Sequence, residues 1–433
     1  MSAPAYESYK DSGVEWLGQV PSHWAVRPFK RAFRVVSEKA TERSWALGLE
    51  HIEGWTGRLT ESSADFEGDG TAFEPGDILY GKLRPYLAKV YVAPQNGEAV
   101  GDFHVLRSND LSISSLFASY YLRSKETVSQ LNSSTYGARM PRVSWDFMGM
   151  LPIPQPPAAE QTAIAAFLDR ETGKIDALIE AQTRLIELLK EKRQAVISHA
   201  ITKGLNPDAP MKDSGIEWLG QVPAHWGVAT LRHLTTQIVD GAHFTPTYVE
   251  DGVPFLRVTD ITRKEIDLQE VKRIPEHEHI DLIKRCNPKI GDLLLSKNGT
   301  IGVPKVVDWN WEFSIFVSLC LIKLNNKLSA KYVEKVFMSK GIEVQISADT
   351  KQSTVTNLHL EKIANFYFPV PPMEDQEKIS SHIEKVTKKY DRLVTEAESA
   401  VSLLRERRAA LISAAVTGKI DVRRLVNVES EAA

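Results

Sequence analysis

A 17-residue stretch that occurs twice constrains this chain more than any other feature. Residues 10–26 return as residues 212–228, with 14 of 17 positions identical and only conservative exchanges (Val/Ile, Ser/Ala, Ala/Gly) at the other three. A period near 200 residues is far too long for a solenoid, whose repeats span about 20–50 residues. The chain therefore consists of two homologous halves, each long enough to form a domain.

The composition is that of a globular protein. Of the 433 residues, 42% are hydrophobic and 25% are charged, and the length suggests two or three domains. No run of about 18 apolar residues is present, which predicts no membrane span, and the first residues do not resemble a secretory signal. Cys286 and Cys320 lack metal-ligand spacing, which favours a cytoplasmic location and argues against a structural zinc site. The net charge of -3 implies that any nucleic-acid-binding surface is local.

A second pair of repeats follows two proline-rich breaks, around residues 152–157 and 369–372. Long helices are expected after them, over about 159–202 and 375–416, and they align without a gap at an offset of 215 residues. Their apolar residues recur at a spacing of three and four, which is typical of a coiled-coil seam. The residues expected to pack between helices or to dock a partner are Leu168, Ile175, Leu178, Leu185, Leu189, Val196, Ile383, Tyr390, Leu393, Leu404 and Leu411.

The regions between these repeats have diverged. The 17-residue copies lie 202 residues apart and the helices 215, so the second variable region is 13 residues longer (215 minus 202). Short apolar runs predict strands at 78–80, 88–92, 254–258 and 292–295, and residues 114–131 predict one helix. The fold class is therefore α+β, with two mixed domains that alternate with two long helices. The expected boundaries are 1–152 for the first domain, 153–205 for the first helix, 206–368 for the second domain, and 369–433 for the second helix and tail.

Two motifs carry a resemblance to a known family. One is Lys-Asp-Ser-Gly-x-Glu-Trp-Leu-Gly-x-x-Pro-x-His-Trp, and the other is Pro-Pro-x-x-x-Gln leading into a helix that ends Ile-Ser-x-Ala-x-Thr; each occurs twice. In this order they resemble the specificity subunit of type I restriction–modification systems, over nearly the whole chain. The resemblance implies two target recognition domains, each reading one half of a split, asymmetric site in double-stranded DNA. It also implies two antiparallel helices that act as a spacer, so that the duplication is pseudo-twofold.

The same resemblance implies the partners. Two methyltransferase subunits dock on the helices and supply both the chemistry and S-adenosylmethionine, restriction subunits can join them, and this chain itself holds no cofactor and catalyses nothing.

Candidate DNA contacts were sought in stretches without acidic residues, because phosphate binding needs cations that no nearby carboxylate neutralises. Bases are read by Arg, Lys, Asn, Gln, Ser or Thr side chains that enter a groove. Two such stretches occur in each half, one after a Gly-Asp-x-Leu turn and one before the proline break. The first half contributes Lys82, Arg84, Tyr86, Lys89, Ser134, Tyr136, Arg139 and Arg142. The second half contributes Lys297, Asn298, Thr300, Lys305, Lys351, Gln352, Thr354 and Asn357.

Other readings of the sequence remain open. The repeated tryptophans and histidines are expected to be packing anchors instead of base-stacking groups, because they are identical in both halves; they are Trp16, Trp24, Trp218, Trp226, His23 and His225. No methyltransferase, phosphate-loop or zinc-protease motif is present. Asp260 with Glu270-Val271-Lys272 loosely mimics a metal-dependent nuclease. A nuclease with its own active site and a coiled-coil adaptor that binds only proteins are the alternatives.

Overall fold

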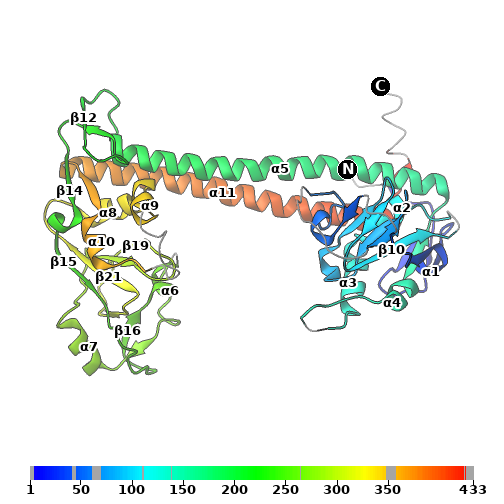
Figure 1. Cartoon of the computed structure of the whole chain (residues 1–433), viewed down its shortest axis with the longest axis horizontal. Helices are drawn as coiled ribbons and strands as arrows, with labels where there is room; N and C mark the ends of the chain where they lie inside the picture. The colour runs from blue at the N-terminus through cyan, green and yellow to red at the C-terminus, as the bar shows by residue number, and fades with distance from the viewer. Residues whose placement is uncertain are drawn as a thin grey trace. The chain divides into compact units, whose positions relative to one another are not determined.

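The chain forms two compact units in a computed structural model that describes residues 4–40, 45–60, 70–109, 112–137, 139–263, 265–347, 357–423 and 425. The first unit comprises Met1–Thr183 and Glu398–Ala433, and the second comprises Arg184–Ala397. Both boundaries fall inside the two long helices, α5 (Ala158–Lys203) and α11 (Met373–Val416) (Figure 1). These bounds confirm the two helices expected from the sequence to within two residues at each end.

Each unit is built around an antiparallel four-stranded sheet of the same order. In the first unit the order is β4 (Phe33–Val36), β10 (Phe103–Ser108), β7 (Ile78–Gly81) and β8 (Val90–Val92). In the second it is β15 (Thr235–Asp240), β21 (Leu319–Leu324), β18 (Leu293–Ser296) and β19 (Pro304–Val306). Every residue of β7 and β18 is buried, because both faces of the sheet are covered, and this is why the two strands are continuous apolar runs.

The extra residues of the second unit lie before its central strand. β4 and β15 start 202 residues apart (235 minus 33), whereas β7 and β18 start 215 apart (293 minus 78). In this interval the first unit has β5 (Ala46–Leu47), η1 (Leu49–His51) and β6 (Thr71–Phe73). β5 and β6 both pair with β9 (Gly97–Ala99) and form a small sheet. The second unit has β16 (Val253–Leu256), α6 (Val258–Ile261), β17 (Arg273–Ile274) and α7 (Glu276–Ile283), and β20 (Ser314–Ile315) joins β16 and β17.

The remaining elements occur in matching pairs. The hairpin β1 (Tyr9–Asp11)–β2 (Gln19–Pro21) matches β12 (Met211–Asp213)–β13 (Gln221–Pro223). The two-stranded ladder β3 (Ala25–Pro28)–β11 (Pro152–Gln155) matches β14 (Gly227–Thr230)–β22 (Tyr367–Val370). The short helices pair as α1 (Phe29–Ala32) with η3 (Leu231–Leu234), α2 (Ser115–Leu122) with α8 (Ala330–Phe337), α3 (Lys125–Ser133) with α9 (Lys340–Ser347), and α4 (Trp145–Met150) with α10 (Leu360–Asn365). Outside the interval where the two units differ, η2 (Pro85–Leu87) is the one described element without a counterpart.

The prediction of one helix over 114–131 is wrong, because the chain forms α2 and α3 there. The break falls at Arg123 and Ser124, both buried. The Ser124 hydroxyl donates to the carbonyl of Tyr121 at 2.8 Å and contacts Thr127 Oγ1 at 2.9 Å, and Ser124 takes the extended conformation that caps α3. Serine at such a position competes with the helical hydrogen bonds and favours a new start.

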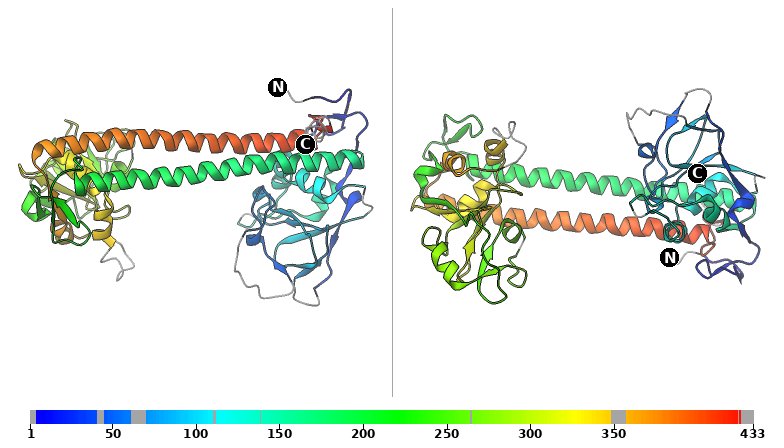
Figure 2. Two further views of the ribbon diagram at one scale, coloured as in Figure 1. Left: turned by 90° about the horizontal axis from the view of Figure 1, so that it is seen from above. Right: turned by 60° about the horizontal axis from the view of Figure 1, so that its bottom comes forward.

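The two long helices are antiparallel. In the first unit, Ile164 and Leu168 at the start of α5 share a core with Ile412 and Val416 at the end of α11. In the second unit the two helices swap these roles: Ile197 and Ile201 at the end of α5 share a core with the start of α11. The stretches of α5 and α11 that belong to each unit lie side by side (Figure 2). Each unit is therefore completed by the start of one helix and the end of the other.

The repeated sequence motifs form the joint between domain and helix. Trp24 and Trp226 are almost fully buried, and their indole N–H groups donate to Glu160 and Asp375 at the starts of α5 and α11. Gln161 accepts a hydrogen bond from a backbone N–H of its own domain at 2.7 Å, and Gln376 does the same at 2.9 Å. The packing role expected for the tryptophans is thus confirmed, and it explains why these residues repeat while the domains diverge.

The predicted packing residues divide into three groups. Leu168, Ile175 and Ile383 are buried, and the half-buried residues are Leu189, Val196, Tyr390, Leu393, Leu404 and Leu411. Leu178 and Leu185, by contrast, are 52% and 42% exposed, so a helix-packing role is wrong for them. A pair of helices buries only the stripe where they touch, and the additional apolar residues of the heptads face outward. No helix in the described parts of the chain is both long and apolar enough to cross a membrane.

Candidate nucleic-acid interface

The structure brings together the two stretches that were singled out in each half of the sequence. In the first unit, the N–H of Val143 donates to the carbonyl of Lys82 at 3.1 Å, and residue 83 forms a β-bridge with Arg142. In the second unit, the N–H of Leu358 donates to the carbonyl of Lys297 at 2.8 Å, and residue 298 forms a bridge with residue 357. All four positions are related by the offset of 215. We call residues 82–89 with 134–143 the first loop pair, and residues 297–305 with 357–358 the second loop pair.

The first loop pair has a strained backbone and exposed aromatic and basic side chains. Arg84 and Ala88 have φ angles of 52° and 48°, a left-handed conformation that costs non-glycine residues energy and persists only where the surroundings fix it. Here the N–H of Arg84 donates to the carbonyl of Pro141 at 2.7 Å. Between the two strained residues Tyr86 is 45% exposed, and Tyr136 on the neighbouring loop is 59% exposed. Arg84 and Arg139 are exposed as well.

Four other candidates of the first loop pair serve the fold instead of pointing freely to solvent. Arg142 makes two hydrogen bonds to Asp102, at 2.8 and 3.0 Å, and Lys82 lies 3.9 Å from the same carboxylate. The hydrogen bonds from Arg142 lower the pKa of Asp102, so this carboxylate is charged and neutralises its partners. Lys89 donates to a backbone carbonyl at 2.6 Å, and Ser134 donates to another at 2.9 Å. The sequence did not reveal this partner, because Asp102 lies 40 residues before Arg142 and therefore outside the stretch without acidic residues.

The second loop pair presents different groups. Thr300 and Asn357 are exposed, and Asn298 and Lys305 are half-buried. Lys297, however, is only 5% exposed and lies 2.9 Å from Asp240, so it is not available to a phosphate, contrary to the expectation. Asp240 also accepts from Arg285, a contact that the sequence did not suggest. The candidates Lys351, Gln352 and Thr354 lie outside the described residues.

The described residues offer no assembled catalytic centre for the nuclease alternative. Asp260 is buried and accepts hydrogen bonds from the backbone N–H and the side chain of Arg257, as a helix cap does. No group of three or more His, Cys, Asp or Glu side chains gathers as metal ligands do within the described ranges. Both cysteines are buried, and burial raises the pKa of Cys286 to about 12, which leaves this thiol a poor nucleophile.

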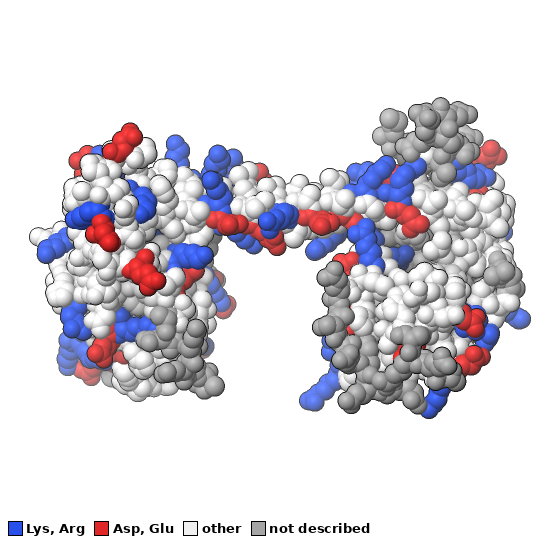
Figure 3. Space-filling model, turned by 45° about the horizontal axis from the view of Figure 1, so that its top comes forward, with Lys and Arg blue, Asp and Glu red and all other residues white. Residues whose placement is uncertain are grey.

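Charges of both signs are mixed over the face of the molecule shown in Figure 3, including the exposed flanks of the helices. No single basic field dominates this face, in line with the net charge of -3. Exposed cations such as Arg84 and Arg139 are local groups that can attract a polyanion.

Comparison with known proteins shows which family the chain resembles. The family model "Type I restriction modification DNA specificity domain" matches residues 67–190 and 245–400. The EcoBI specificity subunit of a type I restriction enzyme from Escherichia coli is 24% identical over 302 residues, which cover 68% of this chain and 63% of that protein. The MjaVIII specificity subunit from Methanocaldococcus jannaschii is 24% identical over 318 residues, covering 72% of this chain and 71% of that protein. The chain thus spans less than two thirds of the EcoBI subunit.

Solved structures share the fold. A chain from a structure that describes complex assembly and conformational transition of the type I R-M system superposes with a TM-score of 0.72 at 17% identity, over 92% of this chain and 98% of that one. The HsdS subunit from Thermoanaerobacter tengcongensis superposes with a TM-score of 0.53, also at 17% identity, over 93% of this chain and 98% of its own.

Proposed function

Because the chain belongs to the family of type I restriction modification DNA specificity domains, we propose that it is the non-catalytic subunit that selects the DNA site of a type I restriction–modification complex. Each unit reads one half of a two-part, asymmetric site in double-stranded DNA. The two long helices set the distance between the halves.

One observation carries this proposal: the same loop pair recurs at equivalent positions in both units, on a repeated frame, with different exposed side chains. The first pair offers arginine and tyrosine, whereas the second offers threonine and asparagine. Such side chains read base edges through their donors and acceptors, and arginine also neutralises phosphates. Two loop pairs with different exposed side chains, on one duplicated scaffold, suit a DNA site whose two halves differ in sequence. Neither the nuclease nor the adaptor alternative is favoured by any contact of the described residues.

The partners belong to the proposal as well. Leucines 178 and 185 of α5 are each exposed, and apolar helix residues left open to water favour docking of a further helix. We assign these leucines to the docking of two methyltransferase subunits, which bring S-adenosylmethionine, and expect restriction subunits to join them. The complex works in the cytoplasm, where its DNA is found.

Sequencing of methylated DNA tests the function directly. In a host that expresses this chain with its methyltransferase subunits, we expect one motif, made of two unlike half-sites with a fixed gap. A single uninterrupted motif, or methylation that persists when this chain is deleted, would contradict the proposal.

The gap should respond to helix length. A heptad inserted in α5 after Thr183 and another in α11 after Ala397 keeps the packing face and adds about 10 Å to each helix, or about three base pairs of DNA. We expect both half-sites to keep their bases and the gap to widen by about this number. An insertion in only one helix is the control, because it puts the helices out of register and should abolish methylation. New half-site bases with the old gap would refute the spacer role.

The two exposed arginines of the first loop pair should carry phosphate contacts. Arg84→Ala and Arg139→Ala are each expected to weaken binding of the assembled complex to its site by about tenfold, and to reduce the slope of log affinity against log salt concentration by about 1. Filter or fluorescence titrations at several salt concentrations measure both quantities. Arg232→Ala, an exposed arginine outside both loop pairs, is the matched control and should change neither. An unchanged slope in both loop variants would remove these residues from the interface.

A further inference from the structure

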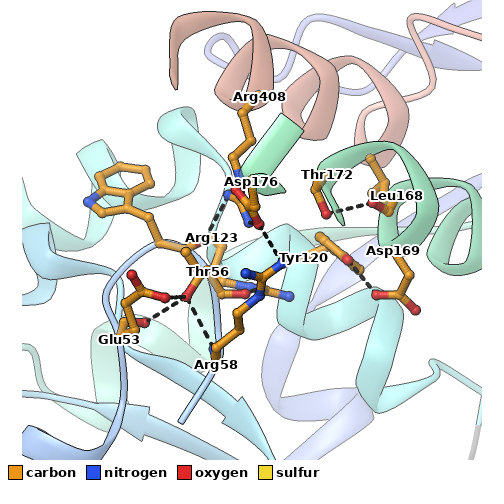
Figure 4. Close-up of polar contacts among 11 residues, drawn as sticks. Glu53, Thr56, Arg58, Tyr120, Arg123, Leu168, Asp169, Thr172, Asp176 and Arg408 are labelled. Carbon is orange, nitrogen blue, oxygen red and sulfur yellow. Dashed lines mark hydrogen bonds and ion pairs between the residues drawn. The ribbon is translucent and has the colours of Figure 1, made fainter. Parts of the chain in front are cut away.

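A turn of the first recognition domain, residues 53–58, is fastened to both long helices within the first unit. Arg408 of α11 donates from Nε to Asp176 of α5 at 2.8 Å and from Nη1 to the carbonyl of Trp55 at 2.9 Å. Arg58 of the turn approaches the same carboxylate, with 3.2 Å between Nη2 and Oδ2. Figure 4 shows Asp176 between the two guanidinium groups. We call Arg58, Asp176 and Arg408 the junction cluster.

A third arginine holds the turn from the domain side. Arg123 is only 7% exposed, donates to the carbonyl of Ser119 at 3.1 Å and to the carbonyl of Thr56, and lies over the ring of Tyr120 at 4.4 Å (Figure 4). Burial lowers the pKa of Arg123 to about 10, so it is still charged at neutral pH. Buried charged donors require their acceptors to stay in place. The carbonyls of the turn are therefore fixed by Arg123, which lies between α2 and α3, and by Arg408 of α11.

Hydrogen bonds within the turn, such as that from the N–H of Glu53 to the carbonyl of Arg58 at 2.9 Å, close it, yet two of its residues have left-handed backbone angles. Trp55 has a φ of 69°, which strains a residue with a side chain. Gly57 has a φ of 72°, and a Cβ added there would lie 2.5 Å from Nη1 of Arg123 and 2.8 Å from the carbonyl of Val90. Only glycine permits so close an approach. Arg123 and Arg408 bind carbonyls of the turn and so add to these hydrogen bonds in holding its conformation.

The second unit has the equivalent ion pair without the turn. Arg193 and Asp391, at the offset of 215 from Arg408 and Asp176, approach to 2.9 Å. The side chain of Asp391 is 61% exposed, whereas that of Asp176 is 9% exposed. The turn lies in the interval where the two domains differ in length, between β4 and β7. Within the described residues, the first domain alone is thus tied to the helices at this position.

We propose that Asp176 and Arg408 are positioning residues that lock the first recognition domain onto the helices and thereby make the complex strict about the gap between half-sites. This inference rests on the proposed function. An ion pair buried under a strained turn has one low-energy arrangement, so the first loop pair is held at one place along the DNA. When the lock is released, the domain can shift, and DNA with a longer or shorter gap becomes acceptable.

Gap preference tests the proposal in the complex of the full chain with its methyltransferase subunits. The substrates are duplexes with the native gap and with gaps one base pair longer and shorter. Asp176→Asn keeps the size of the side chain but removes its charge. We expect the ratio of methylation rates, native gap over altered gap, to fall by about tenfold, since a hydrogen bond to a charged group is worth about a factor of ten or more. The rate on the native gap should stay within about twofold, because no base contact is touched. Asp391→Asn is the matched control and should leave the ratio unchanged.

Hydrogen exchange of the chain without DNA provides a second measurement that does not depend on the function. Asp176→Asn should speed exchange of the amides at 53–58 by about tenfold or more, and Asp391→Asn should not. Faster exchange with an unaltered gap ratio would overturn the positioning role, and unaltered exchange would overturn the lock itself. If Asp176→Asn does not fold, Arg58→Gln takes its place, because the side chain of Arg58 is 52% exposed and its loss is tolerable. If the wild-type complex shows no two-part site, the proposed function fails and the positioning role falls with it, while the exchange result still decides whether the lock exists.

Discussion

Asp240→Ala is expected to lower the free energy of unfolding of the second unit by about 3–5 kcal/mol. Asp240 ends β15 and is only 4% exposed, and its carboxylate lies 2.9 Å from Nζ of Lys297, which is 5% exposed. Without the carboxylate, the ammonium of Lys297 stays buried with its charge uncompensated. Native-state hydrogen exchange of β15, β18 and β21, which form the core of this sheet, measures the change.

The same carboxylate predicts a pH dependence. Burial alone would raise the pKa of Asp240, but hydrogen bonds from His243, Lys297 and Arg285 outweigh it and lower the pKa to about 2. An unfolded aspartate titrates near about 3.9, so the native state binds this proton more weakly. The stabilisation is complete above about pH 4 and is lost as the pH falls towards 2. The Asp240→Ala variant should lack this part of the acid dependence.

Asp281→Ala is the control, because Asp281 pairs with Lys284 on the surface, where both side chains are 71% exposed. Exposed pairs contribute little to stability, and no measurable change is expected. Equal stability of wild type and Asp240→Ala at neutral pH would show that Lys297 finds another partner or releases its proton. The structural role assigned here to Lys297 would then be wrong.

The long helices could be predicted closely, because their sequences contain both the period and the end signals. The break at Pro156-Pro157 and the glycine at 204 delimit α5, and apolar residues recur through its 46 residues, which no proline interrupts. Residues 114–131 contain no such end signal. Their division into α2 and α3 depends on Ser124, whose hydroxyl donates to the carbonyl of Tyr121, and on burial of Arg123 against the turn at 53–58, which is a tertiary contact that no local pattern contains.

The candidate interface was predictable as a pair of regions but not residue by residue. A Gly-Asp-x-Leu turn and a proline break, both repeated, located the loops that meet in each unit. Which cations remain free depends on carboxylates that are distant in sequence: Asp240 lies 57 residues before Lys297, and Asp102 lies 40 before Arg142. A window that excludes neighbouring acids cannot find these partners, because the sheet brings them together only after folding.

Exchange of one variable region is expected to replace one half-site completely. If residues 230–365 are replaced by the matching region of another member of the family, methylation at the old second half-site should fall by about 1,000-fold or more, the usual ratio of specific to non-specific recognition. The first half-site and the gap should be retained. Exchange of residues 27–150 is the reciprocal variant and should change the other half-site. Methylome sequencing of hosts that express each chimera with the same methyltransferase subunits reads out both.

The joint between domain and helix explains why such chimeras should fold. Gln376 stays outside the exchanged region and bonds to backbone groups within it, the N–H of residue 329 and the carbonyl of residue 327, at 2.9 and 2.8 Å. Every residue supplies the carbonyl, and every residue except proline supplies the N–H. Trp226 likewise stays outside and bonds to Asp375. The equivalent ion pair of the second unit, Arg193 with Asp391, lies in the long helices outside the exchanged region, and the junction cluster lies in the first unit, so the gap should remain as strict as before. If both half-sites changed in the 230–365 chimera, the units would not read independently, and the division of the target between two duplicated readers would have to be abandoned.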